Sequence, residues 1–346
     1  MISSFYFLFS LILSFVFAFF LIRVMKRWRI LDRRRPVPLG GGMAIYGSFL
    51  LSAWLLLLNG RVSAPADILA YMFGLSIGGL VLMIGGFIDD RYNLRARWQI
   101  IFAVLAAGFM AIGAPGPVSL THPLGGSLSL MRFTIFLPVI GTVAVFSSLV
   151  TFCWLMGLMY TTKFLDGLDG LVAGIVAIGG AVIFLITREP RWADPDVNLL
   201  AIVFIAACLG FLAWNWSPAK IFLGEGGSLF TGYALGVLAI AAGGKIATTL
   251  LVMAVPVIDV LRVIVLRLRK GQPFFVGDRE HLHFKLQKLG LSSRQTVLLF
   301  YGISALFGMV AFFWQREERF IAVAAGVVLS CLLGVWFSRR RTVLSR

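Results

Sequence analysis

Eleven long apolar runs constrain the fold of this 346-residue chain more than any other feature of its sequence. Most of them approach the roughly 20 residues that an α-helix needs to cross the hydrocarbon core of a bilayer. The chain is 60% hydrophobic, and its apolar residues run continuously instead of alternating, which excludes an ordinary soluble domain and a β-barrel. We therefore predict an all-α polytopic membrane protein that forms one domain over residues 1–346. The expected spans are 2–22, 40–58, 68–88, 98–113, 136–159, 171–187, 198–214, 228–244, 246–267, 296–314 and 320–337.

Basic residues indicate how these spans are oriented. The first span has no charge before it, whereas seven lysines and arginines follow between Arg23 and Arg35. A cleaved signal peptide carries its positive charge before the apolar region, so we predict an anchor with the N-terminus outside. Alternation from there puts 24 of the 31 lysines and arginines on the cytoplasmic side, together with the C-terminus. Residues 114–135 are then external, and their Ser-Leu-Ser-Leu alternation predicts a small β-hairpin.

The charged residues also narrow the function. In a membrane chain, the net charge of +16 indicates basic loops that face anionic lipid or an anionic substrate, and no nucleic-acid partner is expected. The acidic residues gather on the predicted cytoplasmic side. Charges at membrane depth are costly and need an ion, water or a substrate as a partner, so this group predicts a functional site there. Its members are Asp89, Asp90, Asp166, Asp169, Glu225, Asp259, Asp278 and Glu280, with His281 and His283 beside them.

The central stretch from Tyr160 to Leu171 holds Lys163, Asp166 and Asp169 between two apolar runs. These three residues lie at i, i+3 and i+6, so they share roughly one face if the stretch is helical. The glycines of its Asp-Gly-Leu-Asp-Gly sequence let the backbone or a ligand approach closely.

Three of these acids, and a nearby asparagine, suggest how anionic ligands are held. Asp89 and Asp90 are adjacent carboxylates that repel each other unless they share a cation, and Mg²⁺ prefers such oxygen ligands; a solvated helix cap is the alternative. Glu225 lies in a glycine-flanked turn that is open to a ligand on most sides. Asn215 offers both a donor and an acceptor, as recognition of a nucleobase or an acetamide group requires.

The late polar residues allow several roles. Asp259 is followed one turn later by Arg262, which is compatible with a simple i, i+3 salt bridge. His281 and His283 are candidate metal ligands, phosphate partners or proton carriers, and an isolated His-x-His is weak evidence for zinc.

Six motifs between Pro36 and Phe284 occur in the same order as in the polyprenyl-phosphate N-acetylhexosamine-1-phosphate transferase family and resemble them. Within that family, they are closer to the GlcNAc-1-phosphate transferases than to the phospho-MurNAc-pentapeptide translocases. The family's histidine-rich loop is present here as His-x-His without the triple histidine of the translocases, which argues against MurNAc-pentapeptide as the substrate. The matching segments are Pro36–Gly42, Asp89-Asp90, Asp166–Leu171, Asn215–Gly226, Pro256–Asp259 and Asp278–His283.

The resemblance implies transfer of an N-acetylhexosamine 1-phosphate, most simply GlcNAc 1-phosphate, from a UDP-sugar to undecaprenyl phosphate with release of UMP. It implies Mg²⁺ as the cofactor, with Mn²⁺ as a substitute, and a multi-pass enzyme of the bacterial cytoplasmic membrane whose active site faces the cytoplasm. Such a reaction would be the first membrane step of a cell-surface glycan. The implied roles are Asp89 and Asp90 for the lipid phosphate and the metal, Glu225 for Mg²⁺, Asp166 and Asp169 for placing the nucleotide sugar, Asn215 for the nucleotide, Lys163 and Asp259 for substrate binding, and Arg279, His281 and His283 for the diphosphate.

The chain departs from the family's pattern at three positions. Tyr160 and Lys163 stand where the family usually has asparagine, and Glu225 stands where it usually has aspartate. Lys163 could pair with Asp166, reach a substrate phosphate, or simply extend toward the membrane interface.

Two other functional classes compete with the transferase. An ion-coupled transporter could use the same acids as a proton relay, although transporters tend to contain internal repeats and broken helices at the midplane. A non-catalytic scaffold would leave the acids without a purpose. The sequence leaves open which sugar is used, which glycan follows, and whether the chain forms a homodimer.

Overall fold

A computed structural model describes residues 2–63, 65–121, 127–138, 141–269, 271 and 281–313. The described chain is mostly helical, with two small antiparallel hairpins. Its helices are α1 (Ile2–Arg27), α2 (Gly42–Leu58), α3 (Ala66–Tyr92), α4 (Ala96–Gly113), α5 (Val145–Leu165), α6 (Leu171–Ile186), the 3₁₀ turn η1 (Pro190–Trp192), α7 (Pro195–Asn215), α8 (Gly224–Ala241), α9 (Ile246–Val252), α10 (Ala254–Arg269), α11 (Leu282–Lys288) and α12 (Ser293–Phe313), and its strands are β1 (Ser119–Thr121), β2 (Ser127–Ser129), β3 (Thr134–Leu137) and β4 (Gly141–Ala144).

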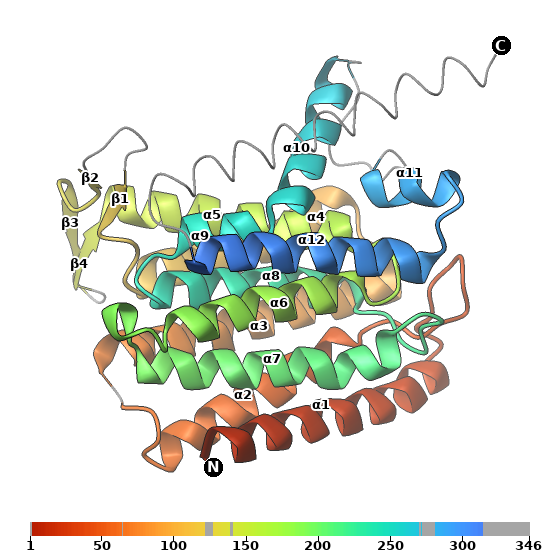
Figure 1. The fold of residues 1–346 in the computed structure, drawn as a ribbon, viewed down its shortest axis with the longest axis horizontal. Helices are drawn as coiled ribbons and strands as arrows, with labels where there is room; N and C mark the ends of the chain where they lie inside the picture. Colours follow the sequence, from red (N-terminus) through yellow and green to blue (C-terminus); the bar gives the residue numbers. More distant parts are fainter. Residues whose placement is uncertain are drawn as a thin grey trace.

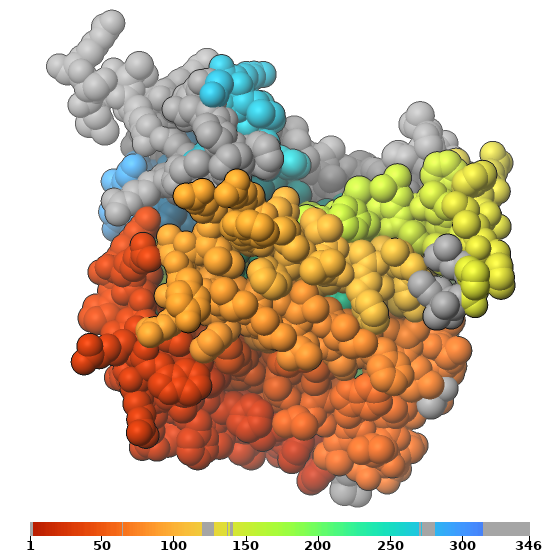
Figure 2. Space-filling model, turned by 180° about the vertical axis from the view of Figure 1, so that it is seen from behind, coloured from red at the N-terminus to blue at the C-terminus, as the bar shows by residue number. Residues whose placement is uncertain are grey.

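Most of the long helices run side by side, and α8 lies at the centre of the bundle (Figure 1). Helix α8 packs against α2, α3, α5 and α6 and is buried along nearly its whole length. A helix that is surrounded by protein in this way has little need for a polar face. Seen from behind, the N-terminal third of the chain covers the lower and central part of the visible face (Figure 2).

Helices α1 and α7 pack along each other over much of their length. The hydroxyl groups of Ser10 and Ser14 donate to the carbonyl oxygens of Val203 and Ala207 at 2.8 and 2.6 Å. Gly210 of α7 lies so close to α1 that a side chain there would overlap the α1 backbone. Small residues and interhelical hydrogen bonds hold helices together where lipid removes the hydrophobic drive to associate.

The prediction of a helical protein with several membrane-spanning segments is confirmed. Among the described residues, six helices are long and apolar enough to span a bilayer, or seven if the bent pair α9–α10 counts as one span, and α2 and α6 are shorter apolar helices. Ten of the eleven predicted spans contain a described helix, and the eleventh, 320–337, lies outside the described residues. The number eleven and the orientation of the termini remain predictions.

Two predicted spans have the wrong shape. The span 136–159 is wrong at its start because Thr134–Leu137 pairs with Gly141–Ala144 as a hairpin, so helix α5 begins only at Val145. The span 246–267 is interrupted by a bend of 81° between α9 and α10. Pro256 has no N–H with which to continue the α9 hydrogen-bond ladder, which accounts for a break at this place.

The predicted hairpin within 114–135 is confirmed. Strands β1 and β2 pair in antiparallel register, with Leu120 opposite Leu128. Both hairpins lie at the opposite end of the bundle from α11 (Figure 1).

Candidate functional site

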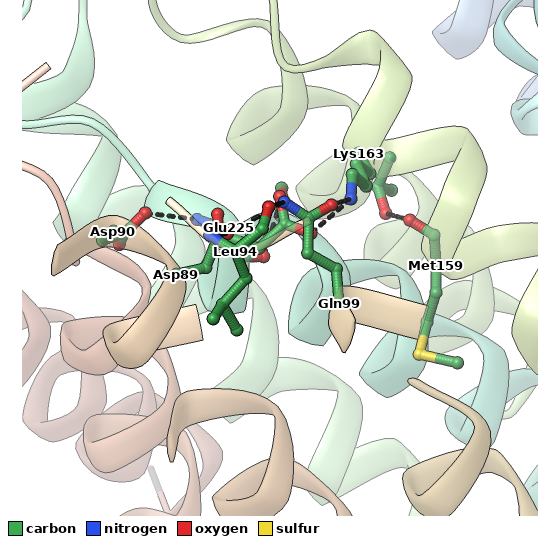
Figure 3. Close-up of polar contacts among 9 residues, drawn as sticks. Asp89, Asp90, Leu94, Gln99, Met159, Lys163 and Glu225 are labelled. Atoms are coloured by element: carbon green, nitrogen blue, oxygen red, sulfur yellow. Dashed lines mark hydrogen bonds and ion pairs between the residues drawn. The ribbon is translucent and has the colours of Figure 1, made fainter. Parts of the chain in front are cut away.

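Helices α3 and α5 end, and helix α8 begins, at one end of the bundle, and this brings Asp89, Asp90, Lys163 and Glu225 together (Figure 3). The close approach depends on two glycine pairs at the start of α8. Gly226 lies against Gly86 of α3, and Gly227 lies against Gly42 of α2, with no space for a side chain at either crossing. The motifs that are far apart in sequence thus meet because the helix backbones touch.

The aspartate pair faces two different neighbours. Asp90 Oδ1 accepts a hydrogen bond from the backbone N–H of Glu225 at 3.1 Å, so its carboxylate caps the first turn of α8. Asp89 Oδ1 accepts from the N–H of Leu94 and from Nε2 of Gln99, both at 2.8 Å. Figure 3 shows Asp90 beside the backbone of Glu225, and Asp89 beside Leu94 and Gln99.

Lys163 continues this network toward Glu225. Its ammonium donates to Gln99 Oε1 at 2.9 Å and forms an ion pair with Glu225 Oε1. Lys163 does not pair with Asp166, which the sequence suggested as a possible partner. Gln99 thus connects the aspartate pair to the lysine, and the lysine connects to the glutamate.

The two aspartates of the central turn have different surroundings. Helix α5 ends at Leu165, so Lys163, Asp166 and Asp169 do not continue along one helical face. Asp169 is buried and binds both terminal nitrogens of Arg35, at 3.1 and 2.6 Å, and the N–H of Ala219 at 3.1 Å. Asp166 is open to solvent and lies near the charges of Glu225 and Asp169.

Asn215 is buried at the end of α7 and uses both ends of its amide group inside the protein. Its Oδ1 accepts from the N–H of Gly170 at 3.0 Å, and its Nδ2 donates to the carbonyl oxygen of Ile221 at 2.8 Å. The side chain therefore ties the central turn to the loop that leads into α8.

Asp259 on α10 anchors the start of α11. Its carboxylate pairs with Arg262 at 2.6 Å, which confirms the expected i, i+3 salt bridge, and it also contacts His281 Nδ1 at 2.9 Å. His281 stacks on His283, whose ring nitrogens have no hydrogen-bond partner among the described residues. Burial and the nearby His281 lower the pKa of His283 to about 4, so the ring is neutral near pH 7. Arg279 lies outside the described residues.

The donor set at this end of the bundle matches the chemistry of Mg²⁺. Within the described residues, no group of three or more histidine, cysteine or acidic side chains forms a ready-made metal cage. Mg²⁺ is usually held by only one or two carboxylates, with waters and substrate phosphates completing its shell. One oxygen each of Asp89, Asp90 and Glu225 has no hydrogen bond in the described part of the chain, so these residues retain oxygen donors for an ion.

Sequence reasoning missed two residues of this site. Gln99 bridges Asp89 and Lys163, and Arg35 holds Asp169. Gln99 is a polar side chain near the start of an apolar helix, which was a usable signal. Arg35 is one of seven basic residues in its segment, so nothing local distinguished it.

Comparison with known proteins decides the family. A family model described as glycosyl transferase family 4 matches residues 72–243, a range that contains the aspartate pair, the central turn and Glu225. A decaprenyl-phosphate N-acetylglucosaminephosphotransferase of Mycobacterium leprae is 30% identical over 340 residues, covering 88% of this chain and 81% of the relative. The chain belongs to glycosyl transferase family 4. The resemblance inferred from the motifs is thereby confirmed.

Two other relatives have similar descriptions. A probable undecaprenyl-phosphate N-acetylglucosaminyl 1-phosphate transferase of Bacillus subtilis is 30% identical over 247 residues, covering 69% of this chain and 65% of the relative. The undecaprenyl-phosphate alpha-N-acetylglucosaminyl 1-phosphate transferase of Escherichia coli is 27% identical over 316 residues, covering 85% and 79%. The chain thus spans slightly less than two thirds of the Bacillus relative and most of the other two. Family membership and the apolar helices together identify a multi-pass membrane protein.

Proposed function

We propose that this protein transfers N-acetylglucosamine 1-phosphate from UDP-N-acetylglucosamine to undecaprenyl phosphate and releases UMP. The observation that carries the proposal is the meeting of Asp89, Asp90, Lys163 and Glu225 at one end of the bundle, within the residues that match the family model. The relatives named above act on polyprenyl phosphate and N-acetylglucosamine according to their descriptions, which supports the same substrates here. Family membership favours this transferase over an ion-coupled transporter.

In the proposed reaction, an oxygen of the lipid phosphate attacks the phosphorus that carries the sugar. The bond between that phosphorus and the oxygen of UMP breaks, and UMP leaves with the electron pair. Phosphoryl transfer depends mainly on positioning and on neutralising negative charge. A magnesium ion, or Mn²⁺ in its place, would neutralise phosphate charge when held by Glu225 with one of the two aspartates, Asp89 or Asp90, and by the substrate phosphates.

The other residues have proposed positions around the substrates. Asp89 activates the lipid phosphate, and Asp166, which is open to solvent, places the nucleotide sugar together with Asp169. The Lys163 ammonium contributes positive charge beside Glu225. Asn215 acts on the nucleotide through the turn and loop that it ties together. Arg279 and His281 contact the diphosphate, and Asp259 keeps His281 in place. His283 was expected to contact the diphosphate as well, but it is fully buried and instead stacks on His281, so its role is to position that ring.

We further propose the orientation of the protein in the bacterial cytoplasmic membrane. The N-terminus lies outside, and the acidic end of the bundle faces the cytoplasm, where UDP-sugars are made. Eleven spans and a cytoplasmic C-terminus complete this topology. Homodimer formation is compatible with it but is not required by the site.

Purified protein in detergent provides the test of the reaction. UDP-N-acetylglucosamine and undecaprenyl phosphate should give UMP and a lipid-linked sugar diphosphate, and EDTA should stop the reaction until Mg²⁺ is restored. UDP-N-acetylgalactosamine and UDP-MurNAc-pentapeptide serve as competing donors, and Asp90→Asn serves as the inactive control. Absence of UMP release with every donor would exclude the proposed function, and preference for another donor would change only the sugar.

A further inference from the structure

A pocket of about 460 Å³ lies between the last turns of α1, Trp214 at the end of α7, and two loop segments at 36–38 and 219–220. None of the acids or histidines assigned to the reaction lines it. It shares a wall with the candidate site, because the N–H of Ala219 in this wall donates to Asp169. The two loops that line the pocket are joined to each other, since the N–H of Phe222 donates to the carbonyl oxygen of Pro38.

Three cations line this pocket, namely Arg23, Lys26 and Lys220, and none of the described acidic residues does. Arg23 and Lys26 are three residues apart on α1, so they lie on the same side of the helix. None of the three forms a salt bridge with a carboxylate in the part of the chain that the structure describes. The pocket therefore concentrates positive charge without a counterion from the described residues.

Aromatic rings hold two of these cations in place. The guanidinium carbon of Arg23 lies 3.9 Å from the centre of the Phe19 ring, and Lys220 Nζ lies 4.9 Å from the centre of the Trp214 ring. Phe19 and Trp214 both line the pocket and pack against each other, with ring centres 5.8 Å apart. Such cation–π contacts orient a charged group without neutralising it, so the charges stay available to an anion.

The apolar face of α1 continues from the pocket toward the other end of the bundle. Phe15 and Phe20 expose 40% and 55% of their surface, and Ile12 exposes 57%, so this face contacts lipid in a membrane. Basic residues follow at the end of the helix, and they would reach the phosphate headgroups when α1 spans the bilayer. Basic pockets between helices on the cytoplasmic side are a known way to bind the headgroups of anionic lipids.

We propose that this pocket binds the phosphate headgroup of an anionic phospholipid, whose acyl chains lie along the exposed face of α1. The site is distinct from the one that binds the reacting phosphates, and it does not require that the proposed reaction be correct. The ligand is therefore a lipid with an anionic phosphate headgroup, either a phosphomonoester or a phosphodiester, and attached acyl chains. Phosphatidylglycerol is the simplest probe with this chemistry.

Native mass spectrometry of the full chain in neutral detergent measures the binding directly. Phosphatidylglycerol should bind more tightly than phosphatidylcholine with the same acyl chains. The triple variant Arg23→Gln, Lys26→Gln, Lys220→Gln should bind phosphatidylglycerol about 100-fold more weakly, because each cation near an anionic headgroup contributes roughly fivefold. The matched control Arg95→Gln, Arg97→Gln, Lys288→Gln removes the same charge from exposed residues outside the pocket and should bind like the wild type.

Other arms of the experiment separate the alternatives. Equal loss of binding in both triple variants would overturn the proposal, since it would show only a net-charge effect. Displacement of phosphatidylglycerol by inorganic phosphate at equal concentration would also overturn it, in favour of a free-anion site. Selective loss of undecaprenyl phosphate would assign the pocket to the substrate instead. If the triple variant fails to fold, Lys220→Gln alone should weaken phosphatidylglycerol binding about fivefold, and unchanged binding would contradict the site.

Discussion

The ammonium group of Lys163 forms an ion pair with the carboxylate of Glu225, and the two side chains expose only 18% and 14% of their surface. Lysine at this position is a departure from the family's usual asparagine, and its partner is a departure from the usual aspartate. Two of the three residues that depart from the family's pattern thus contact each other. A longer carboxylate and a flexible cation compensate for one another, which predicts that neither can be changed alone without cost.

The first prediction concerns that lysine. Lys163→Met keeps the apolar stem but removes the charge, so Glu225 is left without its cation and Gln99 loses a donor. We expect at least a tenfold fall in kcat or a comparable rise in KM for the UDP-sugar, which corresponds to about 1.4 kcal/mol or more. Lys163→Asn should retain more activity than Met because its amide can still donate hydrogen bonds. Near-wild-type kinetics for both variants would leave Lys163 with no role beyond extending toward the interface.

The second prediction concerns Glu225. Glu225→Gln keeps the size of the side chain and the backbone N–H that donates to Asp90, but it removes the charge that a metal ion needs. Turnover should disappear while thermal unfolding in detergent still shows one cooperative transition. Ser228→Ala, one turn later on α8, is the control and should stay active, since its hydroxyl only donates to the carbonyl oxygen of Glu225. Ordinary activity of Glu225→Gln at ordinary Mg²⁺ would move the metal to other residues.

The third prediction concerns the contact between the central turn and the histidines. A methyl group at Gly167 would overlap the ring of His283, which is fully buried and cannot move aside without displacing α11. Gly167→Ala should therefore lower activity by about 100-fold, since misplacement of a substrate-binding group by roughly 1 Å has an effect of this size. Gly157→Ala on α5 has open space around the new methyl group and should leave activity unchanged. Equal activity of the two variants would show that α11 does not need to pack on the turn.

The fourth prediction is a pH dependence of stability. Burial lowers the pKa of His283 from its usual 6.5 to about 4, so the unfolded chain binds a proton more readily than the folded one between these values. Protonation of His283 therefore does not affect the free energy of unfolding above pH 6.5. It lowers that free energy progressively as the pH falls from 6.5 toward 4. By pH 4 this residue lowers the free energy of unfolding by roughly 3 kcal/mol. His283→Gln should unfold at a temperature that falls less steeply over this pH range, and an unchanged slope would contradict the shifted pKa.

The fifth prediction tests the orientation in the membrane. Arg61 and Lys288 are both exposed, and the proposed topology places the first outside and the second in the cytoplasm. In a variant without the native cysteines, a membrane-impermeant maleimide added to intact cells should label Arg61→Cys but not Lys288→Cys. Lysed cells should show labelling of both. The reverse pattern in intact cells would invert the topology and move the active site outside.

The apolar runs predicted where the helices lie because each helix is buried in protein or lipid on all sides, and hydropathy measures that property directly. They could not predict the hairpin of Thr134–Leu137 with Gly141–Ala144, because a short apolar strand and the first turns of an apolar helix have the same composition. They also could not predict the bend at Met253, since hydropathy is the same for a straight helix and a broken one.

The acids of the site were predictable because an intramembrane carboxylate is rare and costly. Their partners were not. Asp169 binds Arg35, which precedes it by 134 residues, and Lys163 binds Gln99, which precedes it by 64. Such pairs are set by which helix ends meet, and no local pattern in the sequence encodes that meeting.

The pairing of α1 with α7 has a consequence for how the chain is made. Ser10 and Ser14 find their acceptors 193 residues later, so the first helix leaves the ribosome long before the helix that satisfies its hydroxyl groups. During that interval, each hydroxyl can bond to a carbonyl oxygen of its own helix, and the apolar face of α1 keeps it in the bilayer. Contacts between segments this distant in sequence form late, so the acidic end of the bundle closes only after translation has passed α7 and α8.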